Sequence, residues 1–293
     1  MTTTLTSHLT QTILDVYSKE IEFHAQPVLR FTQFAVQKTD LQAQSGLTVK
    51  VTVYDNLAMG GKLTENVPIG TQTLSTSQKE ISVSEFGNAV AVTELLLQAS
   101  FDDVMGSAAK LLGMDYAKVV DKELMTTALS GTQVIYAGGK ATRATVAAGD
   151  VFSSKEIKDG VEVLSTNNAG KYKADHYVCF VHPHHARGLR DDNEFQEVTT
   201  YGKQYAGEIG KIHDVVFIET TQMPVLTGQG EATADVYQAV MFGENAYALA
   251  TALPVEMRDG GIEDFGRVHK LAWYSIFGTG ILQDANIVRI ETA

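Results

Sequence analysis

The sequence of 293 residues is short of cysteine, of basic charge and of long apolar runs. Its one cysteine, Cys179, excludes an intramolecular disulfide. Lys and Arg number 23 against 35 Asp and Glu, and the net charge of -12 argues against a surface that binds nucleic acid phosphates or anionic membranes. No stretch approaches about 18 uncharged apolar residues, so we expect no transmembrane helix. The start, Met1–Leu5, lacks a basic region followed by an apolar core, which predicts no secretory signal and synthesis in a cytosol.

Apolar residues are nevertheless plentiful, at 44% of the chain, which is ordinary for a soluble globular protein and excludes broad disorder. The length suggests about two domains' worth of chain. The acidic excess is uneven: residues 176–293 carry 16 acidic and 8 basic side chains, residues 1–99 carry 9 and 6, and residues 100–175 carry 10 and 9. Because the first part is nearly balanced, it can approach copies of itself without strong repulsion.

Residues 1–45 are predicted to form an arm rather than a domain. A partial helical stripe predicts a short helix over Thr12–Phe23, which Pro27 interrupts. Phe31 and Phe34 follow on a polar segment that offers them little to pack against. They pack either on the main body of the chain or on a neighbouring subunit. Both alternatives stay open, and we treat the two residues as candidate subunit contacts.

Residues 46–85 are predicted to form a long hairpin that projects from the core. Apolar and polar residues alternate over Leu47–Val53, which is typical of a strand. The return segment, Thr71–Glu80, suits a strand but has few apolar residues, so the ribbon cannot bury enough surface to fold alone. An ordinary surface loop is the alternative, but about 40 residues exceed the usual loop length. The candidate subunit contacts at the tip are Asn56, Met59, Gly60, Gly61, Lys62 and Leu63.

The strongest helical pattern begins at Ser100 and runs to about residue 130. Ser100 followed by Asp103 resembles a capping box, and Gly131 is a natural residue for the C-terminal end. Gly106 and Gly113 lie seven residues apart and share a face of this helix. That face is either a surface for close packing or simply tolerates the two glycines.

The remaining chain is predicted to mix helices and strands. Residues 89–97 are strongly apolar and fit either a buried strand or a short helix. A second helix over Lys155–Asn167 is capped by Ser153 or Ser154, and residues 207–214 are turn-like. The other predicted elements are the strand Tyr177–Val181, a helix from Pro183 to about Arg190, and the strands Val215–Glu219, Val236–Phe242, Gly266–Phe277 and Ala285–Glu291.

No constellation of residues indicates an enzyme or a cofactor site. The string from His182 to His185 is the most metal-like, but Pro183 breaks its spacing and a metal site needs three or four convergent ligands. Cys179 lies in an apolar strand, whereas a catalytic thiolate needs an accessible, electropositive setting. Adjacent acidic pairs such as Asp191-Asp192 point apart on regular structure. We therefore expect no catalytic residue, no cofactor and no metal.

The order of these elements resembles that of the major capsid proteins of tailed bacteriophages, which share the HK-ninety-seven-like fold. The most specific similarity lies in Tyr177–Pro224, with its strand, His-Pro turn, helix and glycine-containing run from Gly207 to Thr220. The resemblance implies an α+β fold of five parts. These are an N-terminal arm at 1–45, an extended E-loop hairpin at 46–85, a peripheral domain at 86–175 with a long spine helix at about 100–130, an axial domain at 176–255, and return strands at 256–293 that complete the peripheral domain.

The resemblance also implies a function. The chain would be a major capsid protein that self-assembles, as hexamers and pentamers, into an icosahedral shell enclosing double-stranded phage DNA without sequence-specific binding. It would be made in the bacterial host cytoplasm and end in the virion. Because the arm of residues 1–45 is short, we expect a separate scaffolding protein, besides a portal and, as an option, a decoration protein. Some members crosslink a loop lysine to a neighbour, and Lys62 has that place, but no specific partner is evident and we expect no crosslink. The alternatives are an encapsulin-like compartment shell and an α+β enzyme with an unrecognised site.

Overall fold

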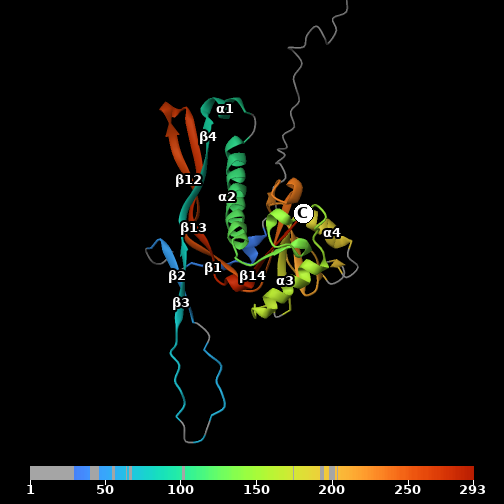
Figure 1. Ribbon diagram of the computed structural model, residues 1–293. Helices are drawn as coiled ribbons and strands as arrows, with labels where there is room; N and C mark the ends of the chain where they lie inside the picture. The colour runs from blue at the N-terminus through green and yellow to red at the C-terminus, as the bar shows by residue number, and fades with distance from the viewer. Residues whose placement is uncertain are drawn as a thin grey trace, which may run out of the picture.

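The computed structural model describes residues 30–39, 46–54, 57–63, 65, 68–100, 103–173, 175–191, 195–197, 202 and 204–293. The chain forms two large sheets and a two-stranded hairpin, with a long helix beside the smaller of the two large sheets (Figure 1). This is an α+β arrangement. Within the described residues, no helix is both long and apolar enough to cross a membrane. The predicted helix at Thr12–Phe23 and the candidate contact Asn56 lie outside the described residues.

The larger sheet has eight strands, in the order β5-β14-β11-β6-β9-β8-β7 with β10 paired to β11. The pairs β5–β14 and β6–β9 are parallel, and the other pairs are antiparallel. Every residue of the central strand β6 is buried, as expected for a strand that is covered on both faces. The strands are β5 (Val134–Tyr136), β6 (Tyr177–Val181), β7 (Gln196–Glu197), β8 (Glu208–Ile212), β9 (Val215–Glu219), β10 (Val225–Leu226), β11 (Val236–Phe242) and β14 (Ile287–Thr292).

Two apolar cores cover the two faces of this sheet. On one face, Ile157 and Leu189 share a core with Phe217. On the other face, Leu124 packs into a core that contains Phe180. Successive side chains of each strand therefore point alternately into the two cores. Because both cores are apolar, the sequences of these strands are continuous apolar runs. The helices that supply these residues are α3 (Ser154–Thr166), α4 (Pro183–Arg190) and α2 (Val104–Leu129).

The smaller sheet has four strands in the order β1-β12-β13-β4, and α2 packs against it. Phe86 stacks on Phe277 at 4.2 Å between ring centroids, and Tyr116 of α2 meets the edge of Trp273 at 5.3 Å. The 26 residues of α2 make a rod of about 39 Å. This helix therefore contributes to the core of both sheets. The strands are β1 (Val36–Lys38), β4 (Ser84–Thr93), β12 (Tyr247–Glu263) and β13 (Val268–Ile281).

The helix α2 begins later than the sequence predicts. Asp103 is its N-cap residue, because its Oδ1 accepts a hydrogen bond from the Gly106 N–H at 2.9 Å. Ser100 instead ends the preceding short helix, α1 (Glu94–Ala99). At the other end, Gly131 does not adopt a left-handed conformation but lies against Ile287. The predicted start of the helix at Ser100 is therefore wrong, since the N-cap residue is Asp103.

Several local predictions are confirmed. The helix α3 begins with a capping box of Ser153 and Glu156. For the apolar segment 89–97, neither the buried strand nor the short helix is correct by itself, because β4 ends at Thr93, α1 begins at Glu94, and only Val92 of the segment is buried. The strands β6, β9 and β11 and the helix α4 have the predicted bounds.

One prediction about the C-terminal half is wrong, and one strand there was missed. Residues 208–212 form the strand β8 and not part of a turn, because they pair with β9 in the larger sheet. The longest strand, β12, was not predicted at all. Its Gly260 and Gly261 and its three register shifts against β13 hide the alternation of a strand.

The predicted long hairpin is confirmed as an antiparallel pair, β2 (Thr48–Tyr54) and β3 (Thr76–Ser82). An ion pair of 2.8 Å joins Lys50 to Glu80 across the two strands. Figure 1 shows that the hairpin extends away from both large sheets. At its root, Val49 and Ile81 pack into a small core with residues of β12.

Candidate assembly surface

The tip of the β2–β3 hairpin, defined here as residues 57–63, exposes apolar side chains. Met59 is 97% exposed, the greatest exposure of any apolar side chain in the described hairpin. Apolar groups on a segment without a core of its own are stabilised only when another surface covers them. The tip is therefore suited to contact with a partner. Among the described residues between β2 and β3, the other large apolar side chains that are exposed are Leu57, Leu63, Ile69 and Leu74.

The sequence-predicted contacts Gly60, Gly61 and Lys62 lie beside Met59 at the same exposed tip. A Cβ atom built on either glycine has no described atom within 4 Å. The structure thus brings together all the tip candidates that it describes. Their contact with a neighbouring copy stays a prediction.

The root of the hairpin is held to the four-stranded sheet by close backbone packing. A Cβ on Gly278 would lie 2.1 Å from the carbonyl oxygen of Ser82. A Cβ on Gly280 would lie 2.7 Å from Cγ1 of Ile81. Because these distances are shorter than any real Cβ contact, both positions of β13 need glycine. The hairpin consequently leaves the body at a fixed place.

A second exposed apolar surface lies at the end of α2 that is opposite to the hairpin (Figure 1). Phe265, in the turn between β12 and β13, is 106% exposed and has a φ of 55°. A positive φ is energetically unfavourable for a bulky residue, so the backbone of this turn is strained at Phe265. Leu95 and Leu96 of α1 are exposed as well. This surface was not predicted from the sequence, although the apolar run at 89–97 was a signal of it.

The candidates Phe31 and Phe34 are buried in their own chain. Their exposed fractions are 0% and 6%. Phe31 stacks on Phe180 at 3.9 Å, and Phe34 meets the edge of Phe242 at 5.9 Å. Packing on the main body is therefore the correct alternative, and the prediction of subunit contacts at these two positions is wrong. Burial of these aromatic rings in the core over β6 stabilises the single chain, so the rings are not exposed to a neighbouring subunit.

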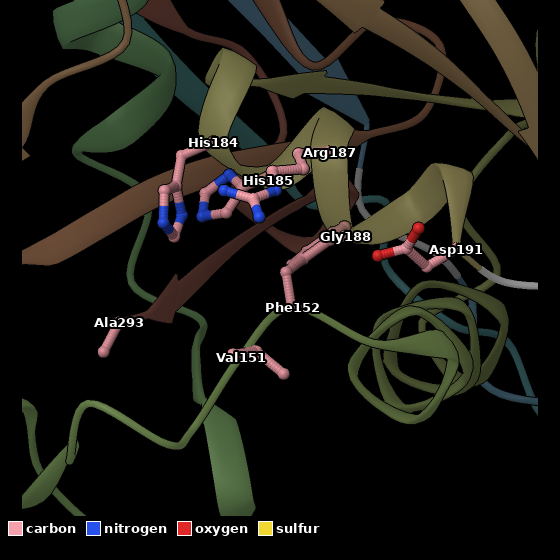
Figure 2. A pocket seen from close by; sticks show the side chains of 8 residues that line it. All are labelled: Val151, Phe152, His184, His185, Arg187, Gly188, Asp191 and Ala293. Carbon is pink, nitrogen blue, oxygen red and sulfur yellow. The ribbon is translucent and has the colours of Figure 1, made fainter.

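The histidine string near α4 is used structurally. The His182 side chain caps α4, because its Nδ1 accepts a hydrogen bond from the His184 N–H at 3.1 Å. The His184 ring stacks on Tyr237 at 4.2 Å, and His185 Nε2 shares a hydrogen bond of 2.8 Å with the Thr292 hydroxyl. Figure 2 shows His184 and His185 at one wall of a pocket of about 200 Å³. No group of three metal-ligating side chains occurs among the residues that the structure describes.

The lone cysteine is also part of the core. Cys179 is fully buried in β6. Burial raises the pKa of its thiol well above the ordinary value, which keeps the thiol protonated. A protonated, buried thiol is a packing group rather than a nucleophile.

Acid is expected to destabilise the chain through His185. Burial, together with repulsion from the neighbouring His182 and His184, lowers the pKa of this histidine from 6.5 to about 3. Between pH 6.5 and about 3, His185 is therefore protonated in the unfolded chain and neutral in the folded chain. Stability falls as the pH falls, by up to about 1.4 kcal/mol per pH unit. Urea unfolding from pH 7 to pH 4 measures this slope. The variant His185→Gln should have a shallower slope, and equal slopes would contradict the assignment.

Comparison with solved structures identifies the fold. The capsid of Ralstonia phage GP4 matches 99% of this chain and 98% of its own, with a TM-score of 0.84 at 15% identity. The capsid of cyanophage Pam1 matches 97% of both chains, with a TM-score of 0.80 at 14% identity. The fold is therefore the HK-ninety-seven-like fold of phage capsid subunits, and the predicted fold class is confirmed.

Sequence comparison then identifies the family. A sequence model described as phage capsid protein matches residues 76–290. The major capsid protein of Staphylococcus phage phiMR11 is 24% identical over 190 residues, which are 64% of this chain and 68% of that protein. The chain belongs to the phage capsid protein family. It is a structural protein of the virion that builds a capsid shell from copies of itself.

Proposed function

We propose that the chain forms hexamers and pentamers of an icosahedral shell around double-stranded DNA, and that the hairpin tip binds a neighbouring copy. The exposed tip carries this proposal. Met59 is 97% exposed on a loop that extends from a body with two buried cores. Covering one such side chain stabilises a contact by about 1.5–3 kcal/mol, which is weak enough to be reversible. Many such contacts per shell add up to a stable particle.

The charge of the chain supports enclosure of DNA rather than binding of DNA. The net charge is -12. A wall of this sign does not hold phosphates through counterion release, so packed DNA stays free to move against it. A scaffolding protein, a portal and a decoration protein remain expectations from the family resemblance, as do synthesis in the host cytoplasm and the division into arm, E-loop, peripheral and axial domains.

The tip is tested by placing a charge on it. The variant Met59→Asp is expected to assemble only at a subunit concentration about tenfold or more above that of the wild type, because it loses at least about 1.4 kcal/mol per contact. Its melting temperature should stay within about 1 °C, because the side chain contributes nothing to either core. Sedimentation velocity and electron microscopy measure assembly, and calorimetry measures melting. Deletion of residues 56–66 should have the same effect more strongly.

The matched control is Val151→Asp, which adds the same charge at another exposed apolar residue, outside the hairpin. This variant should assemble as the wild type does. Equal loss in both variants, or normal shells from Met59→Asp, would refute the role of the tip.

Two further measurements test the enclosed DNA and the absence of a crosslink. Nuclease-protected DNA inside native particles supports a phage capsid over an encapsulin-like compartment, and dissolution into single chains in hot detergent excludes a crosslink at Lys62.

A further inference from the structure

One buried carboxylate on α2 binds the backbone of residues 30–32, which lie within the segment predicted as the N-terminal arm. The Oδ1 atom of Asp121 accepts hydrogen bonds from the N–H groups of Arg30 at 3.1 Å, Phe31 at 2.7 Å and Thr32 at 3.3 Å. The Thr32 hydroxyl donates to the same oxygen at 3.3 Å. Asp121 itself is completely buried. About ninety residues of sequence separate the two sides, so the contact is purely tertiary.

These donors are the free N–H groups at the start of a short 3-10 helix, Phe31–Gln33. The first N–H groups of any helix lack partners within it and require a cap. Arg30 precedes this helix and makes no capping bond with its own side chain among the described residues. Asp121 therefore acts as a cap supplied by another element. Its negative charge also suits the positive end of the helix dipole.

The same segment is held from its other side by the eight-stranded sheet. The ring of Phe31 stacks on Phe180 of β6 at 3.9 Å. The hydroxyl of Tyr247, at the start of β12, donates a hydrogen bond of 2.9 Å to the Phe31 carbonyl oxygen. We name residues 30–34 the strap, because they join α2 to strands of both large sheets.

A glycine makes room for the first residue of the strap. A Cβ on Gly207 would lie 2.1 Å from Nε of Arg30. Gly207 also has a φ of 80°, a conformation that other residues rarely adopt. The Arg30 side chain therefore crosses the loop before β8 at a position where only glycine fits.

A buried carboxylate on a helix face that packs on a core is energetically unfavourable by itself. Removing such a charge from water costs several kcal/mol unless hydrogen bonds compensate. Burial in fact raises the pKa of Asp121, although the bonds from Arg30, Thr32 and Phe31 oppose this rise. An apolar residue would fill the same space at no such cost. The bonds to the strap are the evident compensation.

We propose that Asp121 is a positioning residue that locks the strap to α2 and so fixes the place of residues 30–34 on the body. Each copy in a shell then has its strap in the same place. The lock is a property of the single chain and stands without the proposed function, whereas its consequence for assembly rests on that function.

Hydrogen exchange of the unassembled full chain tests the lock directly, because the amides of residues 30–32 report on the bonds to Asp121. In Asp121→Ala these amides should exchange about 100-fold faster, and in Asp121→Asn about tenfold faster, since the amide keeps an acceptor but loses the charge. Trypsin should cleave after Arg30 in the alanine variant and not in the wild type. The amides of β6 and β11 should keep their protection in both variants. The control is Glu123→Ala on the same helix, which should change neither readout.

Two outcomes would overturn the proposal. One is unchanged exchange at residues 30–32 in Asp121→Ala. The other is an equal loss of protection in β6 and β11, which would show a general structural role. If Asp121→Ala does not fold, Gly207→Ala tests the strap without changing α2, because the new Cβ displaces Arg30. It should accelerate the same three amides, and normal protection there would also refute the proposal. Electron microscopy then shows whether released straps broaden the distribution of particle diameters.

Discussion

Replacing Gly278 with alanine is expected to lower the free energy of unfolding by about 3 kcal/mol and to block shell formation. The new Cβ would lie 2.1 Å from the Ser82 carbonyl oxygen and 3.0 Å from the Val83 Cα. Both are backbone atoms, so the clash cannot be relieved by a side-chain rotation and the hairpin root must shift. A shifted root misdirects the whole β2–β3 hairpin. The hairpin tip would then miss the surface to which we propose that it binds.

Urea unfolding measures the loss of stability, and electron microscopy measures shells. The control is Gly113→Ala in α2, where a Cβ meets no described atom within 4 Å. That variant should gain up to about 1 kcal/mol, because alanine favours a helix more than glycine does. Among the described residues, Gly113 therefore has no close packing partner. Normal stability in Gly278→Ala would show that the root is not held as described.

Replacing Glu291 with alanine is expected to destabilise the chain by about 4 kcal/mol. Glu291 of β14 is 0% exposed. Arg143 binds both of its oxygens at 2.7 Å, and Gln238 donates to Oε1 at 2.8 Å. Nε of Arg289 lies 3.0 Å from the same Oε1. Removal of the carboxylate would leave these partners without compensation, which costs more than the loss of an exposed ion pair.

The pH dependence of this group has a definite sign. Burial by itself would raise the pKa of Glu291, but the hydrogen bonds from Arg143 and Gln238 outweigh burial and lower it. The stabilisation is therefore present above the ordinary glutamate pKa of about 4.3 and is lost as the pH falls through the lowered pKa of the folded chain.

Chemical unfolding at pH 7 measures the effect of Glu291→Ala. The control is Glu263→Ala, which breaks an exposed ion pair with Lys270 and should cost less than about 1 kcal/mol. Equal losses in the two variants would contradict the role of burial.

Local signals in the sequence predicted those elements whose cause is local. The capping box of Ser153 and Glu156 starts α3, and the apolar run Tyr177–Val181 is a strand covered on both faces. Pro183 in the first turn marks α4. The alternation over Leu47–Val53 and the polar return segment predicted the hairpin and hence the candidate contacts at its tip. In each case the residues that decide the structure lie within a few positions of one another.

The elements that the sequence did not reveal depend on distant residues. Although β12 lacks a regular alternation, β1 and β13 bind it on both edges, and its pairing with β13 accommodates three register shifts. Phe31 lies in the core because Asp121, far along the chain, binds the backbone around it. Phe265 is exposed because a long hairpin of β12 and β13 carries it away from both cores.

The sequence by itself determined that this chain has an apolar core without disulfides, a projecting polar hairpin with an apolar tip, and a net acidic charge that disfavours phosphate binding. These properties follow from composition and short-range periodicity, which act along the chain. Only the tertiary structure decided where the hairpin is rooted, which phenylalanines remain available to a neighbour, and where the strap crosses between α2 and the two sheets. Those outcomes depend on steric fit and on burial of charge between segments as far apart as Ser82 and Gly278, or Phe31 and Asp121, and no local pattern encodes such contacts.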